Sequence, residues 1–352
     1  MSEKIHIPKL LAPIRSYEGV VRVIRAGADE VYCDVFPEER EHLWMHRGRN
    51  CAIDSYDELD RVTKYAHSHD IPVILTLNEP FFTEAMEEEM ANHVRQCLDK
   101  GIDAILVGDL GVLSMLKSMQ VNVPLYASTY MVSMNHEAIN FLEKVGFSRA
   151  VIERQLSTFE IKEIVEHSKI DVEVFVHGGG CSNLNGSCYL FHMMSPNMRR
   201  AWSAIDGFLK SPCKLLFDIS EVDEENTVED IPVMDASLWC SLCKLPELGK
   251  TGVMGFKIAG RCLSEEYQEN TTKIYREFID LITQDRMLLF NDMIELIKKE
   301  YFPLPPSLLN LQEGCCEEKR CYYSPLFYSP YKNPPSWSTW TKAQFKWAVL
   351  RE

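Results

Sequence analysis

The sequence of 352 residues lacks any apolar run of the length, about 20 residues, that crosses a bilayer. Its first residues, MSEKIHIPKLLAP, contain no apolar signal-peptide core, so we expect a cytoplasmic protein without a membrane span. Basic residues are also scarce, because 37 lysines and arginines face 52 aspartates and glutamates, which gives a net charge of −15. A broad nucleic-acid surface needs cations against the phosphates, so this balance disfavours one and leaves room only for a local basic groove.

The common hydrolase signatures are missing as well. The chain contains neither H-E-x-x-H nor G-x-S-x-G, and no cysteine–histidine pair stands in a protease-like context. A dyad of Cys181 and His177 would consume a cysteine that is better suited to bind a metal. The residues by themselves therefore give no support to proteolysis.

What the chain does contain is one repeated pattern, a short β-rich run followed by an amphipathic helical stretch. Helical stretches such as YDELDRVTKYAHSHD carry apolar residues at three- and four-residue spacing, and turns such as AGAD and KGID place glycine just past a helix end. Eight strands alternating with helices predict a (β/α)8 TIM-like barrel; an open doubly wound sheet competes, but the even count of eight favours closure. The predicted strand segments are 5–13, 28–36, 71–78, 102–109, 123–130, 148–154, 170–178 and 252–260.

The eighth strand is delayed by a long insertion. We therefore assign the barrel to residues 1–263, with 179–250 inserted between strands seven and eight, at the C-terminal mouth of the barrel. Residues 264–352 form a C-terminal extension, helical to about residue 300 and then rich in proline and aromatic residues. Its aromatic content argues against simple disorder and predicts an irregular strap lying on the barrel.

Polar and ionisable residues follow the predicted strands at the mouth, where (β/α)8 proteins carry their function. Any one of them could equally be an ordinary loop residue or half of a salt bridge, but together they form a ring around one opening. The candidates for catalysis are His177 and Glu153, and those for substrate binding are Arg154, Lys257, Arg261, Asn78 and Asp109.

Cysteines are unusually frequent, with twelve in the chain and several in the insertion. Thiolates from one loop-rich segment suit a tetrahedral zinc ion or an iron–sulfur cluster. Only Cys240 and Cys243 form a tight C-x2-C pair, and the wider spacings indicate ligands gathered from separate loops. On this chemistry alone a cluster, a zinc site and no metal at all stay open. The insertion cysteines are Cys181, Cys188, Cys213, Cys240 and Cys243.

Four segments, in order, resemble the signature segments of peptidase family U32, the collagenase-like peptidases. They are LLAPIRSYEGVVRVIRAGADEVYCDV, VIERQLSTFEIKEIV, VFVHGGGCSNLNGSC and LPELGKTGVMGFKIAGR, and the resemblance covers residues 8–280. It implies a four-iron four-sulfur cluster at the barrel mouth. The cysteines that match the family's pattern are Cys181, Cys188, Cys213 and Cys240, which leaves Cys243 as a bystander.

The resemblance also implies an activity. Members of this family take part in oxygen-independent hydroxylation of ubiquinone precursors or of RNA bases, with prephenate implicated as oxygen donor. The chain is therefore expected to be an iron–sulfur-dependent hydroxylase-type enzyme acting on a small molecule, a nucleic-acid base or a peptide. A non-catalytic, cluster-holding partner in a heterodimer and a U32-type peptidase are the alternatives.

The expected roles at the mouth follow from this reading. Arg154, Lys257 and Arg261 would hold the anionic donor, because guanidinium and ammonium groups bind carboxylates. His177 would transfer protons, since an unperturbed imidazole titrates near neutrality. Glu153 would orient Arg154 or contact the substrate.

The sequence departs from the family pattern in several respects. Ala259 stands where the family usually has a glutamate, which removes one carboxylate from the mouth. Cys262, directly after Arg261, and the cluster CCEEKRC, with Cys315, Cys316 and Cys321, have no counterpart in the pattern.

Overall fold

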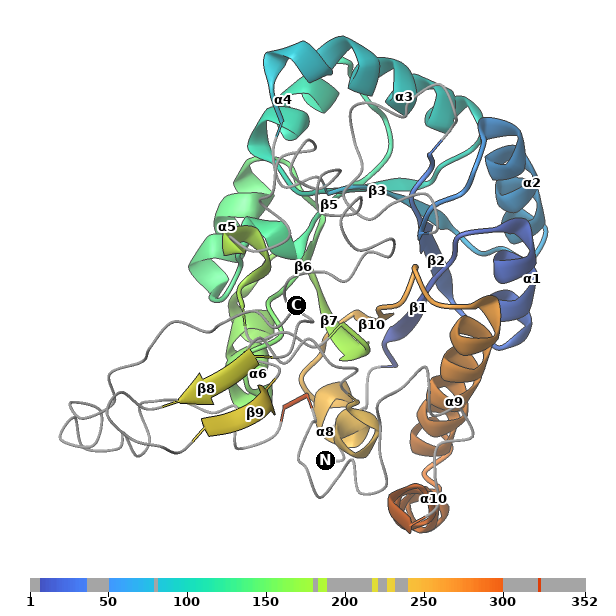
Figure 1. Ribbon diagram of the computed structural model, residues 1–352, viewed down its shortest axis with the longest axis vertical. Coiled ribbons are helices and arrows are strands. Elements are labelled where there is room, and N and C mark those ends of the chain that lie inside the picture. Colours follow the sequence, from blue (N-terminus) through green and yellow to red (C-terminus); the bar gives the residue numbers. More distant parts are fainter. Residues whose placement is uncertain are drawn as a thin grey trace, which may run out of the picture.

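In the computed structural model, eight parallel strands close into a barrel in the order β1-β10-β7-β6-β5-β4-β3-β2 (Figure 1). The described residues are 7–36, 51–78, 82–179, 183–188, 217–220, 227–231, 240–299 and 322–323. Each barrel strand falls inside one of the eight segments predicted from the sequence, so the closed barrel is confirmed over the open sheet. The barrel strands are β1 (Lys9–Pro13), β2 (Glu30–Cys33), β3 (Val73–Leu77), β4 (Ala104–Val107), β5 (Leu125–Ala127), β6 (Arg149–Val151), β7 (Asp171–His177) and β10 (Gly255–Ile258).

Helices surround the barrel, and polar N-cap residues explain where several of them begin (Figure 1). Ser16, Ser55 and Asn135 each accept a backbone N–H bond from the first helical turn, and Ser157 forms a full capping box with Glu160. Among the described residues, none of the helices is long and apolar enough for a membrane crossing. The helices are α1 (Tyr17–Arg25), α2 (Tyr56–His67), α3 (Glu87–Asp99), α4 (Leu110–Ser118), α5 (His136–Lys144), α6 (Thr158–His167), α8 (Leu245–Gly249), α9 (Glu265–Thr283) and α10 (Met287–Lys299), with short 3-10 turns η3 (Glu84–Met86), η4 (Thr129–Met131), η5 (Asn185–Ser187) and η7 (Leu242–Lys244).

The predicted insertion is present between β7 and β10, the seventh and eighth strands of the barrel. It contributes a separate antiparallel pair, β8 (Phe217–Ser220) and β9 (Thr227–Ile231), that lies outside the barrel (Figure 1). After it, β10 pairs with both β7 and β1, so that Lys9 aligns with Gly255 and the barrel closes. The domain limits drawn at 179–250 and 263/264 stay predictions.

The interior of the barrel contains a network of buried charges. Arg149 donates to Glu30 at 2.5 and 3.1 Å and lies 3.2 Å from Glu173. Glu173 in turn pairs with Lys257 at 3.2 Å, and Lys9 joins from the rim through Glu30 at 2.9 Å. Apart from that of Lys9, these side chains are at most 5% exposed, so four strands are joined through charges that water does not screen.

Glu30→Gln is expected to lower the free energy of unfolding by about 3 kcal/mol, because a buried guanidinium cannot shed its proton when its carboxylate is removed. Chemical denaturation followed by circular dichroism measures the loss. Glu166→Gln is the matched control, since its ion pair with Lys162 is exposed and should contribute less than about 0.5 kcal/mol. Equal losses in both variants would contradict a structural role for the buried network.

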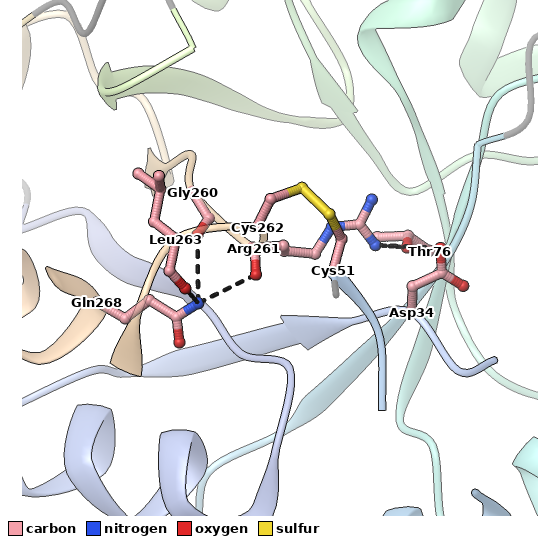
Figure 2. The surroundings of a disulfide bond; sticks show 8 residues. All are labelled: Asp34, Cys51, Thr76, Gly260, Arg261, Cys262, Leu263 and Gln268. Atoms are coloured by element: carbon pink, nitrogen blue, oxygen red, sulfur yellow. Dashed lines mark hydrogen bonds and ion pairs between the residues drawn. A yellow bond between two sulfur atoms is a disulfide. The ribbon is translucent and has the colours of Figure 1, made fainter. Parts of the chain in front are cut away.

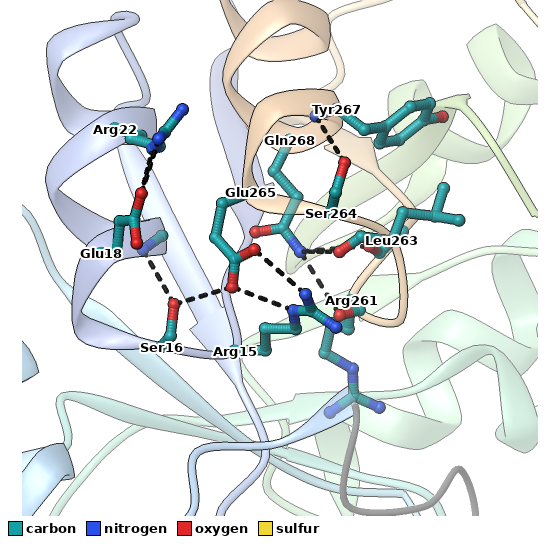
Figure 3. A network of polar contacts seen from close by, with 12 residues as sticks. Arg15, Ser16, Glu18, Arg22, Arg261, Leu263, Ser264, Glu265, Tyr267 and Gln268 are labelled. Carbon is teal, nitrogen blue, oxygen red and sulfur yellow. Dashed lines mark hydrogen bonds and ion pairs between the residues drawn. The ribbon is translucent and has the colours of Figure 1, made fainter. Parts of the chain in front are cut away.

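The first turn of α9 makes polar contacts with the residues just before α1 and with the loop that leads from β10 into α9 (Figure 3). Arg15 donates two hydrogen bonds to Glu265, at 3.1 and 3.0 Å, and Ser16 donates a third at 3.0 Å. The amide of Gln268 donates to the carbonyl oxygens of Gly260, Arg261 and Leu263 at 3.2 to 3.3 Å. These contacts fix the backbone of the loop that leaves β10 toward the mouth.

Two residues of the C-terminal tail lie against β7, as the strap prediction anticipates. The Tyr322 backbone N–H donates to the Cys240 carbonyl at 3.0 Å, and its hydroxyl donates to Gly178 O at 2.6 Å. The Tyr323 hydroxyl donates to Phe175 O at 2.6 Å. Both tyrosines are buried, so this part of the tail belongs to the packed core around the end of β7.

Candidate functional site

Arg261 follows β10 and points its guanidinium across the mouth toward β2 and β3 (Figure 2). It donates to the Thr76 hydroxyl and lies 3.5 Å from a carboxylate oxygen of Asp34. The ring centroid of Tyr32 is 5.7 Å from the guanidinium carbon. Since Arg261 is only 4% exposed, its charge is held in one place before any ligand arrives.

Arg154 brings a second guanidinium to the mouth, from the loop after β6. It donates to the carbonyl oxygen of Gly179, in the turn that ends β7, and stacks 4.5 Å from the Phe175 ring centroid. The structure thus has both arginines buried at the C-terminal ends of strands, and their role as anion ligands stays a prediction.

Lys257 lies deeper than the prediction assumed. Its ammonium is inside the barrel, 3.2 Å from Glu173 and 4.3 Å from the Tyr32 ring centroid. Burial lowers the pKa of Lys257, while the Glu173 carboxylate opposes that effect. Because its charge is already compensated in the core, we favour the two arginines over Lys257 as ligands for an anion.

Glu153, directly before Arg154, is the carboxyl group at the mouth with the most unusual environment. It is 1% exposed; one oxygen accepts the Asn185 backbone N–H at 3.0 Å, and no described group donates to the other. Burial raises the pKa of Glu153 to about 7, against the opposing effects of Arg154 and the Asn185 N–H. A carboxyl group that titrates near neutrality is suited to general acid–base work.

His177 ends β7 as predicted, but its ring is buried against tyrosines of α9. The ring is fully buried, and its Nδ1 lies 3.2 Å from the Tyr275 hydroxyl, which itself donates to Val176 O at 2.6 Å. Burial lowers the pKa of His177 to about 3, so the imidazole is neutral at ordinary pH. Its role in proton transfer stays a prediction; in this geometry the ring packs the end of β7 against α9.

The other two predicted substrate ligands also lie at the ends of strands. Asp109 caps α4, and one of its oxygens accepts the N–H groups of Gly111 and Val112 at 2.6 and 3.1 Å. Asn78 follows β3 and touches Gly108 so closely that a Cβ at position 108 would lie 2.8 Å from the Asn78 Cα. Asp109 therefore has a structural partner in its own helix, and its role in substrate binding stays a prediction.

Two of the four predicted metal ligands lie within the described residues. Cys240 pairs its backbone with His177 at the end of β7, and its sulfur accepts the Leu242 N–H at 3.4 Å. Cys188 is buried, with the Asn183 side-chain amide 4.0 Å from its sulfur. Hydrogen bonds of this kind to sulfur tune cysteine-bound iron–sulfur clusters, so both residues fit a ligand role.

The full ligand set is not tested by this geometry. Cys181 and Cys213 lie outside the described residues, as do Cys315, Cys316 and Cys321. Within the part of the chain that the structure describes, no three metal-ligating side chains gather at one point. The cluster and its four cysteines stay a prediction.

The sequence analysis missed a disulfide between Cys51 and Cys262 (Figure 2). A signal existed, because each cysteine falls in a loop that follows a predicted strand and Cys262 had no counterpart in the family pattern. Asn185 and Tyr275 were also missed, and nothing in their sequence context indicated that they contact Glu153 and His177.

Comparisons with known proteins agree with the resemblance seen in the sequence. The model of peptidase family U32 matches residues 15–301. The chain is 26% identical over 289 residues to the 23S rRNA 5-hydroxycytidine C2501 synthase of Escherichia coli, covering 81% of this chain and 41% of that protein. It is 26% identical over 285 residues to tRNA hydroxylation protein P1 of Bacillus subtilis, covering 79% of this chain and 64% of that one.

A third relative is named for a different activity. The chain is 25% identical over 286 residues to a collagenase of Porphyromonas gingivalis, covering 77% of this chain and 65% of the collagenase. It thus spans less than two thirds of the length of each of these three relatives.

Proposed function

The chain belongs to peptidase family U32, and on that basis we propose that it is an iron–sulfur-dependent enzyme that hydroxylates a base of RNA without molecular oxygen. The observation that carries the proposal is Glu153, a buried carboxyl group with a pKa of about 7 beside the fixed guanidinium of Arg154. The two relatives named for RNA hydroxylation supply the substrate class.

An anionic oxygen donor of the prephenate type is proposed to bind at the mouth. Arg154 and Arg261 hold two positive charges in low-exposure positions, where a carboxylate gains more from a guanidinium than it would in water. Glu153 moves a proton to or from the reacting group through its second oxygen. Excluding water from this opening favours both the ion pairs and the proton transfer.

Cys181, Cys188, Cys213 and Cys240 are the residues that would hold the cluster beside the end of β7. When bound there by four thiolates, the cluster would supply electron transfer. The Leu242 N–H and the Asn183 side-chain amide lie 3.4 and 4.0 Å from the Cys240 and Cys188 sulfurs and would donate to them in the cluster-bound protein.

This chain is proposed to contact RNA over a small surface at the barrel mouth. A chain with a net charge of −15 has no excess of cations for a broad phosphate-binding surface. Because its own cations are few, we propose that a protein partner of the same family supplies further RNA contacts. We place the complex in the cytoplasm, where tRNA and rRNA are found.

The test uses anaerobically purified chain with reductant, prephenate and bulk RNA from cells that lack the corresponding gene. Digestion to nucleosides and mass spectrometry should show one nucleoside that gains a single oxygen atom, and omission of prephenate should abolish the gain. Cleavage of gelatin or casein by the same preparation, with no oxygenated nucleoside, would favour the peptidase alternative that the collagenase relative suggests.

A further inference from the structure

The disulfide joins two loops at the mouth that are far apart in the chain. Cys51 precedes α2 in the connection after β2, and Cys262 follows β10, with a sequence separation of 211 residues (Figure 2). In the barrel, β1 stands between β2 and β10. The bond therefore connects the loops of two strands that are not direct neighbours.

A closed ring of contacts includes this bond and Arg261. Arg261 is the residue before Cys262, and its guanidinium pairs with Asp34 at 3.5 Å. The Asp34 carbonyl accepts the Ile53 N–H at 2.8 Å, and Ile53 lies two residues after Cys51. Within this ring Arg261 is held on one side by its covalent neighbour and on the other through Asp34, in addition to its contacts with Thr76 and Gln268.

The two cysteines differ in their access to solvent. Cys51 is 4% exposed, whereas Cys262 is exposed. Thiol–disulfide exchange begins with attack of a thiolate on one sulfur, so access decides which sulfur reacts. In this geometry the attack falls on Cys262, and Cys51 is the leaving thiol.

We propose that Cys51–Cys262 is a thiol–disulfide exchange site whose redox state sets how firmly Arg261 is held at the barrel mouth. An external thiolate, such as that of glutathione, bonds to the Cys262 sulfur as the Cys51–Cys262 bond breaks, and Cys51 takes up a proton. A second thiol then attacks the mixed disulfide and releases Cys262. The protein disulfide is reduced by two electrons, and two thiols are oxidised to one disulfide.

Two considerations favour exchange over a permanent cross-link. Disulfides that do occur in the reducing cytoplasm, where we place the protein, are mostly transient and redox-sensing. In addition, reduction removes the covalent link from the ring described above, and Arg261 keeps only noncovalent contacts among the described residues, such as its ion pair with Asp34, whose carboxylate is 27% exposed, and its hydrogen bond to Thr76. A looser Arg261 would bind the anionic donor more weakly, and this consequence rests on the proposed function. The disulfide and its hold on Arg261 do not depend on that function.

The first measurement maps the bond in the full-length, cluster-loaded protein. After equilibration with oxidised glutathione, a non-reducing peptide map should contain a linked Cys51–Cys262 peptide, which excess reduced glutathione removes. Independent alkylation of both cysteines after the oxidising treatment would overturn the proposal. Cys243→Ser, which changes an exposed cysteine outside the bond, should leave the linked peptide unchanged.

The second measurement follows Arg261 without reference to activity. Phenylglyoxal modification, mapped by mass spectrometry, should be slow at Arg261 in the oxidised protein and about tenfold faster in Cys262→Ser, because the loop opens more often. Cys51→Ser should behave alike, and Arg149 inside the barrel should stay protected in all forms, which shows that the fold is intact. If the peptide map shows the bond in the wild type but Arg261 reacts equally fast in the wild type and in both cysteine variants, the disulfide does not hold Arg261. That conclusion is independent of the result of the RNA assay.

Discussion

Glu153→Gln is expected to slow the proposed hydroxylation by about 10²- to 10⁴-fold, the usual contribution of a positioned general acid or base. Glutamine has nearly the same shape, and its carbonyl oxygen can still accept the Asn185 N–H, so the local structure is retained. What is lost is a group that exchanges a proton near neutral pH. Rates of nucleoside oxygenation under saturating donor measure the effect.

The same substitution should not destabilise the fold, and this separates a functional role from a structural one. Burial raises the pKa of Glu153 from 4.5 to about 7, so the folded protein binds this proton more tightly than the unfolded chain. The contribution of Glu153 to stability is therefore lost as pH rises from 4.5 to about 7. Above pH 7 the wild type carries a cost of about 3 kcal/mol that Glu153→Gln does not.

Urea denaturation at pH 5 and pH 8 tests that sign. Glu153→Gln should show a smaller fall in unfolding free energy between the two pH values than the wild type does. Glu163→Gln, which changes an exposed carboxylate of α6, should alter neither the rate nor the pH dependence. A Glu153→Gln protein that is less stable than wild type at pH 8 would mean that the ionised carboxylate serves the fold.

Cys240→Ser is expected to remove the iron. Wild-type protein prepared anaerobically should be brown, with about four iron and four sulfide per chain, the content of a four-iron cluster. A serine hydroxyl is a poor substitute for a thiolate, so Cys240→Ser and Cys188→Ser should each lose most of the iron and the visible absorbance. In the structure the Cys240 sulfur accepts the Leu242 N–H, and the Cys188 sulfur lies 4.0 Å from the Asn183 side-chain amide.

Cys243→Ser is the matched control for this experiment, because Cys243 lies three residues from Cys240 but is exposed and outside the family pattern. It should keep the iron. Loss of iron in Cys243→Ser with retention in Cys240→Ser would assign the ligand role to Cys243 in place of Cys240. A colourless wild type with one zinc per chain would favour the zinc site that the cysteine spacing left open.

The barrel could be predicted because its strands and helices follow local periodicity, and their glycine turns and polar caps are local as well. The depth of the Lys257 side chain could not be predicted from the sequence. Whether a strand side chain points into or out of the barrel depends on strand register, and the pairing of β10 with β7 shifts register between Lys257 and Ile258. Whether a residue at the end of a strand faces solvent or core is decided by partners elsewhere in the chain. For His177 that partner is Tyr275, 98 residues later.

The pKa of Glu153 has a similar origin. Its burial and its contact with Asn185 come from the inserted segment, which the sequence places near the mouth without specifying which atoms meet. The disulfide joins two connections 211 residues apart, a distance over which no spacing rule applies. Sequence reasoning thus found the right strand ends and could not assign their chemical environments.

The pairing of β1 with β10, and the docking of Tyr322 on Cys240, have a consequence for biogenesis. A nascent chain leaves the ribosome with β1 first, and that strand must wait with one edge open until β10 has been translated. The carbonyl of Cys240 gains its tyrosine partner later still. The packing around the end of β7 is accordingly completed only after the tail has been translated.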